Sequence, residues 1–272
     1  MLASTAASSN DHRATPTLQT QPRTGIPRVD ILGVHVHVVT MAEAMRAAEA
    51  MTESNEAHQV VTVNPEFIMT AQENQEFRKV LNRATLSFAD GIGVVWASRI
   101  LGHPIRERVP GVEMFENLVS IAAARGLQVF LLGAAEGIAE LAAQVLQQKH
   151  PGLIVAGTLS GTPRPEDDTS ICEIIERAKP DLLFVAFGAP NQDLWIARNQ
   201  PRLCIPLAMG VGGTFDFIVG KAKRAPKALR VVGLEWLHRL IREPWRWKRQ
   251  LALPRFAIAV FLQRLREGSF AD

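Results

Sequence analysis

The chain has 272 residues, a net charge of +3, 47% hydrophobic and 21% charged residues, which are proportions typical of a globular protein with a substantial core. Its two cysteines, Cys172 and Cys204, lie far apart without metal-ligand spacing, which argues against a disulfide framework and favours a reducing cytoplasm. No apolar run reaches the roughly 18–20 residues that a bilayer span needs, which excludes a transmembrane helix.

Residues 1–28 are polar and lack the apolar core of a signal peptide, so we expect a disordered lead-in. Residues 29–39 are rich in β-branched side chains and predict a strand, in which Gly33 marks a turn or a bulge. His35 and His37 lack a third ligand with metal spacing, so core or surface roles are favoured. Thr40 and Glu43 form a capping-box pattern that predicts a helix to about residue 53.

Two buried strands are predicted next, and each ends in polar residues. Residues 58–63 predict the first strand, after which Asn64 and Pro65 suit the cap and first turn of a helix. The second is short and ends at Asp90-Gly91, before a helix to about residue 101. An acid at the end of a strand is where open α/β folds place ligand chemistry. The alternative is that Asp90 only caps the following helix, and the stretch by itself favours neither.

Four more strands are predicted over residues 127–132, 153–158, 181–187 and 205–211, each separated from the next by a helical pattern. The first of them ends in a turn at Gly133 that opens a helix. This geometry brings backbone N–H groups near an anionic ligand, although such turns also serve tight packing of a strand on a helix. The glycine spacing is not the dinucleotide fingerprint, which weakens the case for NAD or FAD.

Strands that alternate with helices predict a Rossmann-like α/β fold, with a mostly parallel sheet covered by helices on both faces. We expect this α/β domain over residues 29–220 and a basic helical appendage over residues 221–272. Because the carboxyl ends of parallel strands share one edge, the residues that follow them line one crevice. The polar and glycine residues placed there are Thr62, Asn64, Asp90, Gly133, Gln192 and Asp216.

The last 52 residues differ in charge from the rest of the chain. Residues 221–272 hold 13 Lys and Arg against 4 Asp and Glu, a balance of +9, whereas the preceding residues balance to −6. A basic segment on an acidic body indicates an anionic partner. Basic amphipathic helices with tryptophan suit a membrane interface, and the alternative is a solvated basic face packed on the body. Helical spacing relates four of the arginines, although Pro244 should break that helix: Arg239, Arg242, Arg246 and Arg249.

A crevice with one well-placed carboxylate suits general-base chemistry on a hydroxyl, and nearby arginines suit a diphosphate. No HExxH, Walker A, kinase or serine-triad pattern occurs, nor a DxD-type acidic pair that would hold a metal on a nucleotide-sugar. The pair Asp167-Asp168 lies in a proline-rich loop and is interpreted as a helix cap. We therefore expect no cofactor and no metal, with arginine neutralising a departing diphosphate.

Eight segments in order carry a resemblance to one enzyme family. They read VTVNPEF (61–67), ADGIGVVWASRILG (89–102), ERVPG (107–111), FLLGAAEGIAE (130–140), GAPNQDLW (188–195), GVGGTFDF (210–217), RAP (224–226) and GLEWLHRLIREPWR (233–246). Together they resemble the WecG/TagA/CpsF glycosyltransferases, glycosyltransferase family 26, from about residue 29 to residue 250.

The resemblance implies an inverting, metal-independent transfer of a hexose, of the N-acetylmannosamine type or glucose, from a UDP-sugar. The implied acceptor is a sugar on undecaprenyl diphosphate at the inner face of the cell membrane, in surface polysaccharide synthesis. The family's general base matches Asp90, and its active-site Thr and Asn match Thr62 and Asn64. The implied donor residues are Arg108, Gln192 and Asp216, with Arg239, Arg246 and Arg249 on the diphosphate.

Two departures from the family pattern weaken any assignment of the exact donor. Asp193 stands where the family usually has Glu, and Glu113 stands where it often has Asp. Both changes conserve charge, so the implied class of reaction stands. The resemblance leaves the donor sugar, the linkage and the oligomeric state open, a homo-oligomer included.

Two other functions rank below this one. A Rossmann-type oxidoreductase acting on a sugar nucleotide explains the alternation of strands and helices and the Gly133 turn, but not the basic, tryptophan-rich tail. A nucleic-acid binder would use the basic tail alone, and we expect no nucleic-acid partner.

Overall fold

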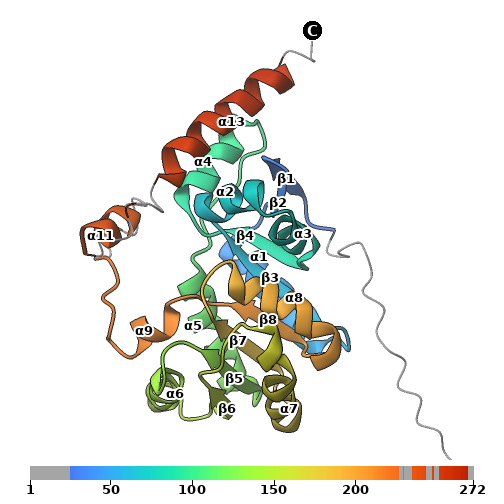
Figure 1. The fold of residues 1–272 in the computed structure, drawn as a ribbon, viewed down its shortest axis with the longest axis vertical. Coiled ribbons are helices and arrows are strands. Elements are labelled where there is room, and N and C mark those ends of the chain that lie inside the picture. Colours follow the sequence, from blue (N-terminus) through green and yellow to red (C-terminus); the bar gives the residue numbers. More distant parts are fainter. Residues whose placement is uncertain (1–24, 227–228, 230–234, 243–246, 248–250, 269–272) are drawn as a thin grey trace, which may run out of the picture.

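The structure is a computed structural model that describes residues 25–226, 229, 235–242, 247 and 251–268. Its centre is a six-stranded, wholly parallel sheet of strand order β4-β3-β8-β7-β5-β6 (Figure 1). This arrangement confirms the predicted α/β class. The strands are β3 (His58–Val63), β4 (Leu86–Ala89), β5 (Gln128–Gly133), β6 (Ile154–Leu159), β7 (Leu182–Ala186) and β8 (Leu207–Gly210).

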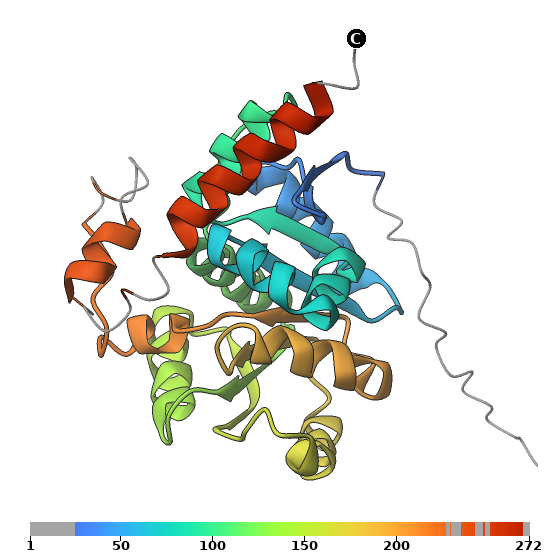
Figure 2. The ribbon, with the colours of Figure 1, turned by 45° about the horizontal axis from the view of Figure 1, so that its top comes forward.

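Helices cover both faces of the sheet (Figures 1 and 2), as expected for parallel strands with near-continuous apolar sequences. One face packs against α1 (Met41–Glu53), α5 (Gly111–Arg125), α6 (Ile138–Lys149) and α9 (Thr214–Ile218). The other packs against α2 (Pro65–Glu73), α3 (Gln75–Arg83), α7 (Asp168–Ala178) and α8 (Asn191–Leu203). The helix α4 (Ile92–Ile100) follows β4, and a 3₁₀ turn, η1 (Pro165–Asp167), precedes α7.

Local capping signals place the first helices where the sequence predicts them. Thr40 and Glu43 form the complete capping box of α1. Asn64 Oδ1 accepts the Phe67 N–H at 3.0 Å, with Pro65 as the first residue of α2. The pair Asp167-Asp168 does not supply the predicted side-chain cap of α7. Asp168 Oδ2 instead accepts a hydrogen bond from Arg198 Nε at 2.5 Å.

Residues 28–37 form a hairpin of β1 (Arg28–Ile31) and β2 (Val34–His37), so Gly33 marks a turn. Both central residues are left-handed, Leu32 with φ 54° and Gly33 with φ 79°. A two-residue turn of this kind matches the twist of its strands and demands positive φ at both positions. Glycine adopts it freely, whereas a leucine there carries a cost of about 1–2 kcal/mol.

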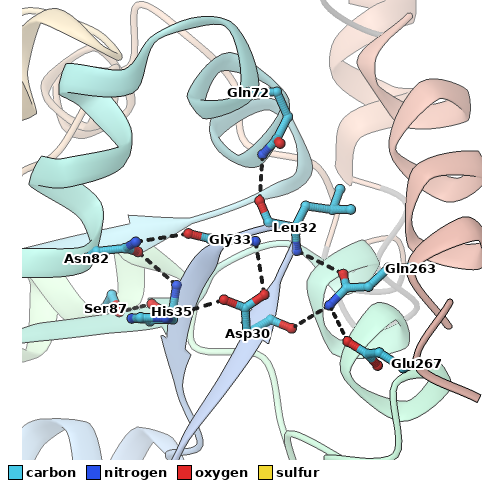
Figure 3. A network of polar contacts seen from close by, with 9 residues as sticks. All are labelled: Asp30, Leu32, Gly33, His35, Gln72, Asn82, Ser87, Gln263 and Glu267. Carbon is cyan, nitrogen blue, oxygen red and sulfur yellow. Dashed lines mark hydrogen bonds and ion pairs between the residues drawn. The ribbon is translucent and has the colours of Figure 1, made fainter. Parts of the chain in front are cut away.

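Side chains from distant elements hold this turn, as Figure 3 shows. The Leu32 N–H donates to Gln263 Oε1 at 2.9 Å, and Gln72 Nε2 donates to the Leu32 carbonyl at 2.8 Å. Asn82 Nδ2 donates to the Gly33 carbonyl at 2.9 Å. These bonds satisfy the backbone groups that the turn leaves unpaired and offset the strain at Leu32.

The two histidines of the hairpin differ in environment. His37 is 1% exposed, and Arg28 Nε donates to its Nε2 at 3.0 Å. Burial and the Arg28 charge lower the pKa of His37 to about 4, so this ring is a neutral core group. His35 lies at the surface, with its Nε2 3.3 Å from Asp30 Oδ2. Within the part of the chain that the structure describes, no cluster of three His, Cys, Asp or Glu could hold a metal.

The predicted basic appendage contains two described helices, α11 (Glu235–Arg242) and α13 (Ala252–Gly268). α13 packs on α2 and α4 and lies beside them in Figures 1 and 2. Its Phe256 and Val260 are 4% and 1% exposed, in the same buried cluster as Val61 of β3. The last helix therefore shares a core with the α/β body. α11 is described as far as Arg242, and Pro244 with its predicted break lies outside the described residues.

Candidate active site

The carboxyl ends of β3 and β4 bring together three of the predicted site residues. Thr62 of β3 stands in register with Phe88 of β4, and it is 8% exposed. Asn64 and Asp90 follow directly on the two strands, and the Asp90 N–H donates to the Val63 carbonyl at 2.8 Å. Thr62, Asn64 and Asp90 therefore lie at one edge of the sheet, where parallel folds hold their ligands.

The Asp90 side chain does not cap the helix that follows it, which makes the cap interpretation wrong. α4 has Gly91 at its cap position and no side-chain cap. Asp90 Oδ1 instead accepts the N–H of Gly111, the first residue of α5, at 3.0 Å. One carboxylate oxygen is thus fixed by the positive end of a neighbouring helix.

Two glycines pack closely against side chains around this carboxylate. A Cβ on Gly111 would lie 2.9 Å from Thr62 Cγ2, and a Cβ on Gly91 would lie 2.9 Å from Pro65 Cδ. Only glycine allows α5 and α4 to approach the two strand ends so closely. Gly111 is a site residue that the sequence reasoning did not single out, although its motif ERVPG was part of the resemblance.

Burial raises the pKa of Asp90 above its ordinary value, and the Gly111 N–H and the Arg108 charge oppose that rise. The charges of Glu235 and Arg224 also act on Asp90, Glu235 raising its pKa and Arg224 lowering it. A carboxyl whose pKa rises toward neutrality is better matched to accepting a proton than a solvated one. The raised pKa and the fixed position of Asp90 suit the general-base role that the resemblance implies, which stays a prediction.

An ion-pair network next to Asp90 joins the body to α11. Arg108 Nη1 lies 3.3 Å from Glu235 Oε2, and Arg224 Nε lies 3.8 Å from Glu235 Oε1. Arg224 Nη2 also pairs with Glu113 Oε1 at 3.1 Å. Arg108 was predicted at the site, whereas Arg224 and Glu235 were not. The signal for them was available in the RAP and GLEW segments of the resemblance.

Gln192 lies on α8 beside the carboxyl end of β8, and its side chain is buried rather than facing solvent. It is 2% exposed, and its Oε1 accepts the Gly212 N–H at 2.9 Å. Asp193 is 1% exposed, and its Oδ2 has no hydrogen-bond partner among the described residues. Burial raises the pKa of Asp193 to about 7. A Cβ on Gly210 would lie 2.5 Å from Gln192 Nε2. This pair therefore forms part of the floor under the strand ends.

Gly133 ends β5 in a conformation that only glycine adopts freely, with φ 102°. A Cβ there would lie 2.8 Å from the backbone carbon of Ala186, its partner in β7. This contact is an instance of tight packing, the second of the two roles that the turn allows. Gly133 shares the sheet edge with Asp90, while its part in donor binding stays a prediction.

The remaining predicted residues lie toward the C-terminus. Asp216 is half-buried in α9, after β8, and its carbonyl accepts the Ala222 N–H at 3.0 Å. Arg239 lies in α11, the helix whose Glu235 meets Arg108. Arg246 and Arg249 lie outside the described residues. Across the described ranges, no helix is both long enough and apolar enough to cross a membrane.

The comparisons with known proteins agree on one family. Residues 29–269 match the family described as "Glycosyl transferase WecG/TagA/CpsF family". The N-acetylglucosaminyldiphosphoundecaprenol N-acetyl-beta-D-mannosaminyltransferase of Bacillus subtilis (strain 168) is 33% identical over 211 residues, 78% of this chain and 82% of that protein. The protein of the same description from Staphylococcus aureus (strain MRSA252) is 35% identical over 231 residues, 84% of this chain and 89% of that protein.

Proposed function

The chain belongs to the WecG/TagA/CpsF glycosyltransferase family, and from that premise we propose that it transfers a hexose from a UDP-sugar to a sugar carried on undecaprenyl diphosphate. The hexose is of the N-acetylmannosamine type or glucose, and the transfer inverts the anomeric centre without a metal. The observation that carries the proposal is the Asp90 carboxylate at the sheet edge, fixed by Gly111 and next to Arg108. The relatives named above support the acceptor class. An oxidoreductase is no longer a candidate.

Asp90 acts as the general base in this proposal. It takes the proton of the acceptor hydroxyl, whose oxygen then bonds to the anomeric carbon while the bond from that carbon to the UDP oxygen breaks on the opposite face. Asn64 Oδ1 is already occupied by the Phe67 N–H, so the side-chain NH₂ group of Asn64 is left to donate to the acceptor. Thr62, next to Gly111, is placed to orient the same hydroxyl.

The departing UDP carries negative charge that the base cannot stabilise. Arg108 supplies a guanidinium group beside Asp90, and such groups bind diphosphate oxygens in pairs. Arg239, Arg246 and Arg249 are proposed to complete this binding, and before substrate binds the Glu235–Arg108 pair holds α11 beside the site. Gln192, Asp216 and Gly133 are proposed to shape the donor pocket at the same edge.

We propose that the enzyme docks peripherally on the inner face of the cell membrane through α4 and α13, which pack together. On α4, Trp96 is 62% exposed, and on α13, Phe261 is 58% exposed. Apolar groups this exposed on adjacent helices mark an interaction surface. Other exposed apolar residues of the two helices are Ile100, Ile258, Leu262 and Leu265. The exposed Arg264 and Arg266 of α13 suit anionic lipid headgroups.

The membrane proposal predicts a loss of vesicle binding in a double variant. Replacing Trp96 and Phe261 with serine should lower the partition onto phosphatidylglycerol–phosphatidylethanolamine vesicles about tenfold or more, because two aromatic side chains no longer leave water. Co-sedimentation of the full chain measures this. Leu141→Ser on α6, which is 49% exposed, is the matched control and should bind as the wild type does. Equal partition of the double variant and the wild type would contradict the docking surface.

The function itself is tested by a transfer assay with the full chain. UDP-N-acetylmannosamine, its uronic acid and UDP-glucose are each supplied with N-acetylglucosaminyl-diphosphoundecaprenol, in parallel reactions with added Mg²⁺ and with a chelator. Mass spectrometry should detect one hexose residue added to the lipid-linked acceptor with one donor of the panel. Absence of any such product under all donors would overturn the proposal, and a product that vanishes with the chelator would overturn metal independence.

A further inference from the structure

Two guanidinium groups meet at the Glu235 carboxylate, and they come from segments more than 100 residues apart. Arg108 precedes α5, whereas Arg224 follows α9. Their side chains are 17% and 19% exposed, and both charges act on the Asp90 carboxyl. Half-buried arginines are uncommon without a role, since burying a cation is costly unless it is paired. Arg224 Nη2 pairs with Glu113 Oε1 at 3.1 Å, and the two arginines share a further carboxylate.

The anion now between them is the carboxylate of Glu235, and it fits neither arginine well. Its oxygens lie 3.3 Å from Arg108 Nη1 and 3.8 Å from Arg224 Nε, longer than the 2.7–2.9 Å of a good charge-assisted hydrogen bond. Arg224 Nε is buried and has no hydrogen-bond acceptor among the described residues. The Glu235 carboxylate thus reaches both cations at long range, and even with Glu113 on Arg224 Nη2 at 3.1 Å the buried Arg224 Nε has no acceptor among the described residues.

A diphosphate would fit this pair of cations better than a carboxylate. It carries more charge and has two phosphate groups, so each guanidinium can bind its own set of oxygens. Glu235 is the first described residue of α11, and its replacement by a diphosphate would free this part of the helix from Arg108 and Arg224. The exchange couples binding of an anionic substrate to the position of the arginine-bearing helix.

Resting on the proposed function, we infer that Arg108 and Arg224 form a two-guanidinium seat for the diphosphate of a substrate, which Glu235 occupies until the substrate replaces it. The seat assigns to Arg224 a binding role beside Arg108. Both the nucleotide donor and the lipid-linked acceptor carry a diphosphate. The structure identifies the shared chemistry, and the experiment separates the two sources.

The test measures binding of UDP and of geranyl diphosphate to the full chain by isothermal titration calorimetry. Arg224→Gln should weaken binding of the seated diphosphate about tenfold or more, because the charged hydrogen bonds of this guanidinium are lost. Glu235→Gln should tighten it about fivefold, because the competing charge is removed. The matched control is Arg125→Gln, which breaks an exposed pair with Glu53 at 2.6 Å and should change neither affinity.

The response of the two ligands identifies the substrate that occupies the seat. A response of UDP alone assigns the seat to the donor, and a response of geranyl diphosphate alone assigns it to the acceptor. Unchanged binding of both ligands by Arg224→Gln, or no tightening by Glu235→Gln, overturns the seat. The tightening is a gain that misfolding cannot produce. If the wild type makes product in the transfer assay while these affinities do not respond, the seat fails and the proposed function stands. If no product forms, the proposed function fails by itself.

Discussion

Asp90→Asn should lower the turnover number of the transfer reaction by about 10²–10⁴-fold, the usual contribution of a positioned general base. The amide has nearly the same shape, and its oxygen can still accept the Gly111 N–H that Asp90 Oδ1 accepts at 3.0 Å. The fold and the binding of UDP should therefore persist, and only the capacity to take a proton is lost. Steady-state kinetics with the lipid-linked acceptor, together with UDP titration, measures both.

The pH dependence gives this prediction a second readout. The base works only when deprotonated, and burial raises the pKa of Asp90. Turnover of the wild type should therefore rise with pH through a midpoint above the ordinary aspartate value of about 3.9. The residual activity of Asp90→Asn should lack this rise of turnover with pH. Glu166→Gln, at an exposed position in η1, is the control and should keep both the rate and the rise. Near wild-type turnover in Asp90→Asn would sink the assignment.

Asp193→Asn should stabilise the fold at alkaline pH. Burial raises the pKa of Asp193 to about 7 from an ordinary value of 3.8, so the folded chain binds this proton more tightly than the unfolded chain does. The stability from this group is fully present below the unfolded pKa and is lost as pH rises through the folded pKa. The full loss is on the order of 4 kcal/mol, at 1.36 kcal/mol per unit of pKa difference.

Urea unfolding at a series of pH values tests this sign. The stability of Asp193→Asn relative to the wild type should rise steadily between about pH 4 and pH 8, by a few kcal/mol. Glu166→Gln again serves as the control, because it changes an exposed carboxyl by the same chemistry. A relative stability that stays flat over this range, or that falls with pH, is incompatible with a buried, protonated Asp193.

Two acids near the carboxyl ends of the strands, Asp90 and Asp193, differ in their surroundings. Asp90 directly follows β4, whereas Asp193 lies in the first turn of α8, after the loop that follows β7. Both have raised pKa values because burial disfavours their charge. Asp90 is reached by arginine charges and a backbone N–H, whereas Asp193 Oδ2 has no partner among the described residues. A neutral Asp193 packs against Gln192 without requiring a counter-ion.

Local signals in the sequence determined the secondary structure and the placement of most site residues. The Thr40–Glu43 capping box and the Asn64-Pro65 helix start depend on atoms only a few residues apart, so the amino-acid pattern is sufficient to predict them. Parallel strand ends share an edge by topology, which is why the sequence by itself is enough to place Thr62 and Asp90 together.

The tertiary structure decided the contacts between distant segments. The Asp90 carboxylate could cap α4 or bind the N–H of Gly111, 21 residues away. Because α5 packs close to the end of β4, the carboxylate binds Gly111. Gln263 lies 231 residues from Leu32, yet it holds the hairpin turn and docks α13 on the body. Arg108, Arg224 and Glu235 meet across three elements. Such pairings depend on how whole elements pack, so a periodicity or motif within one segment predicts which residues are available but not which of them meet.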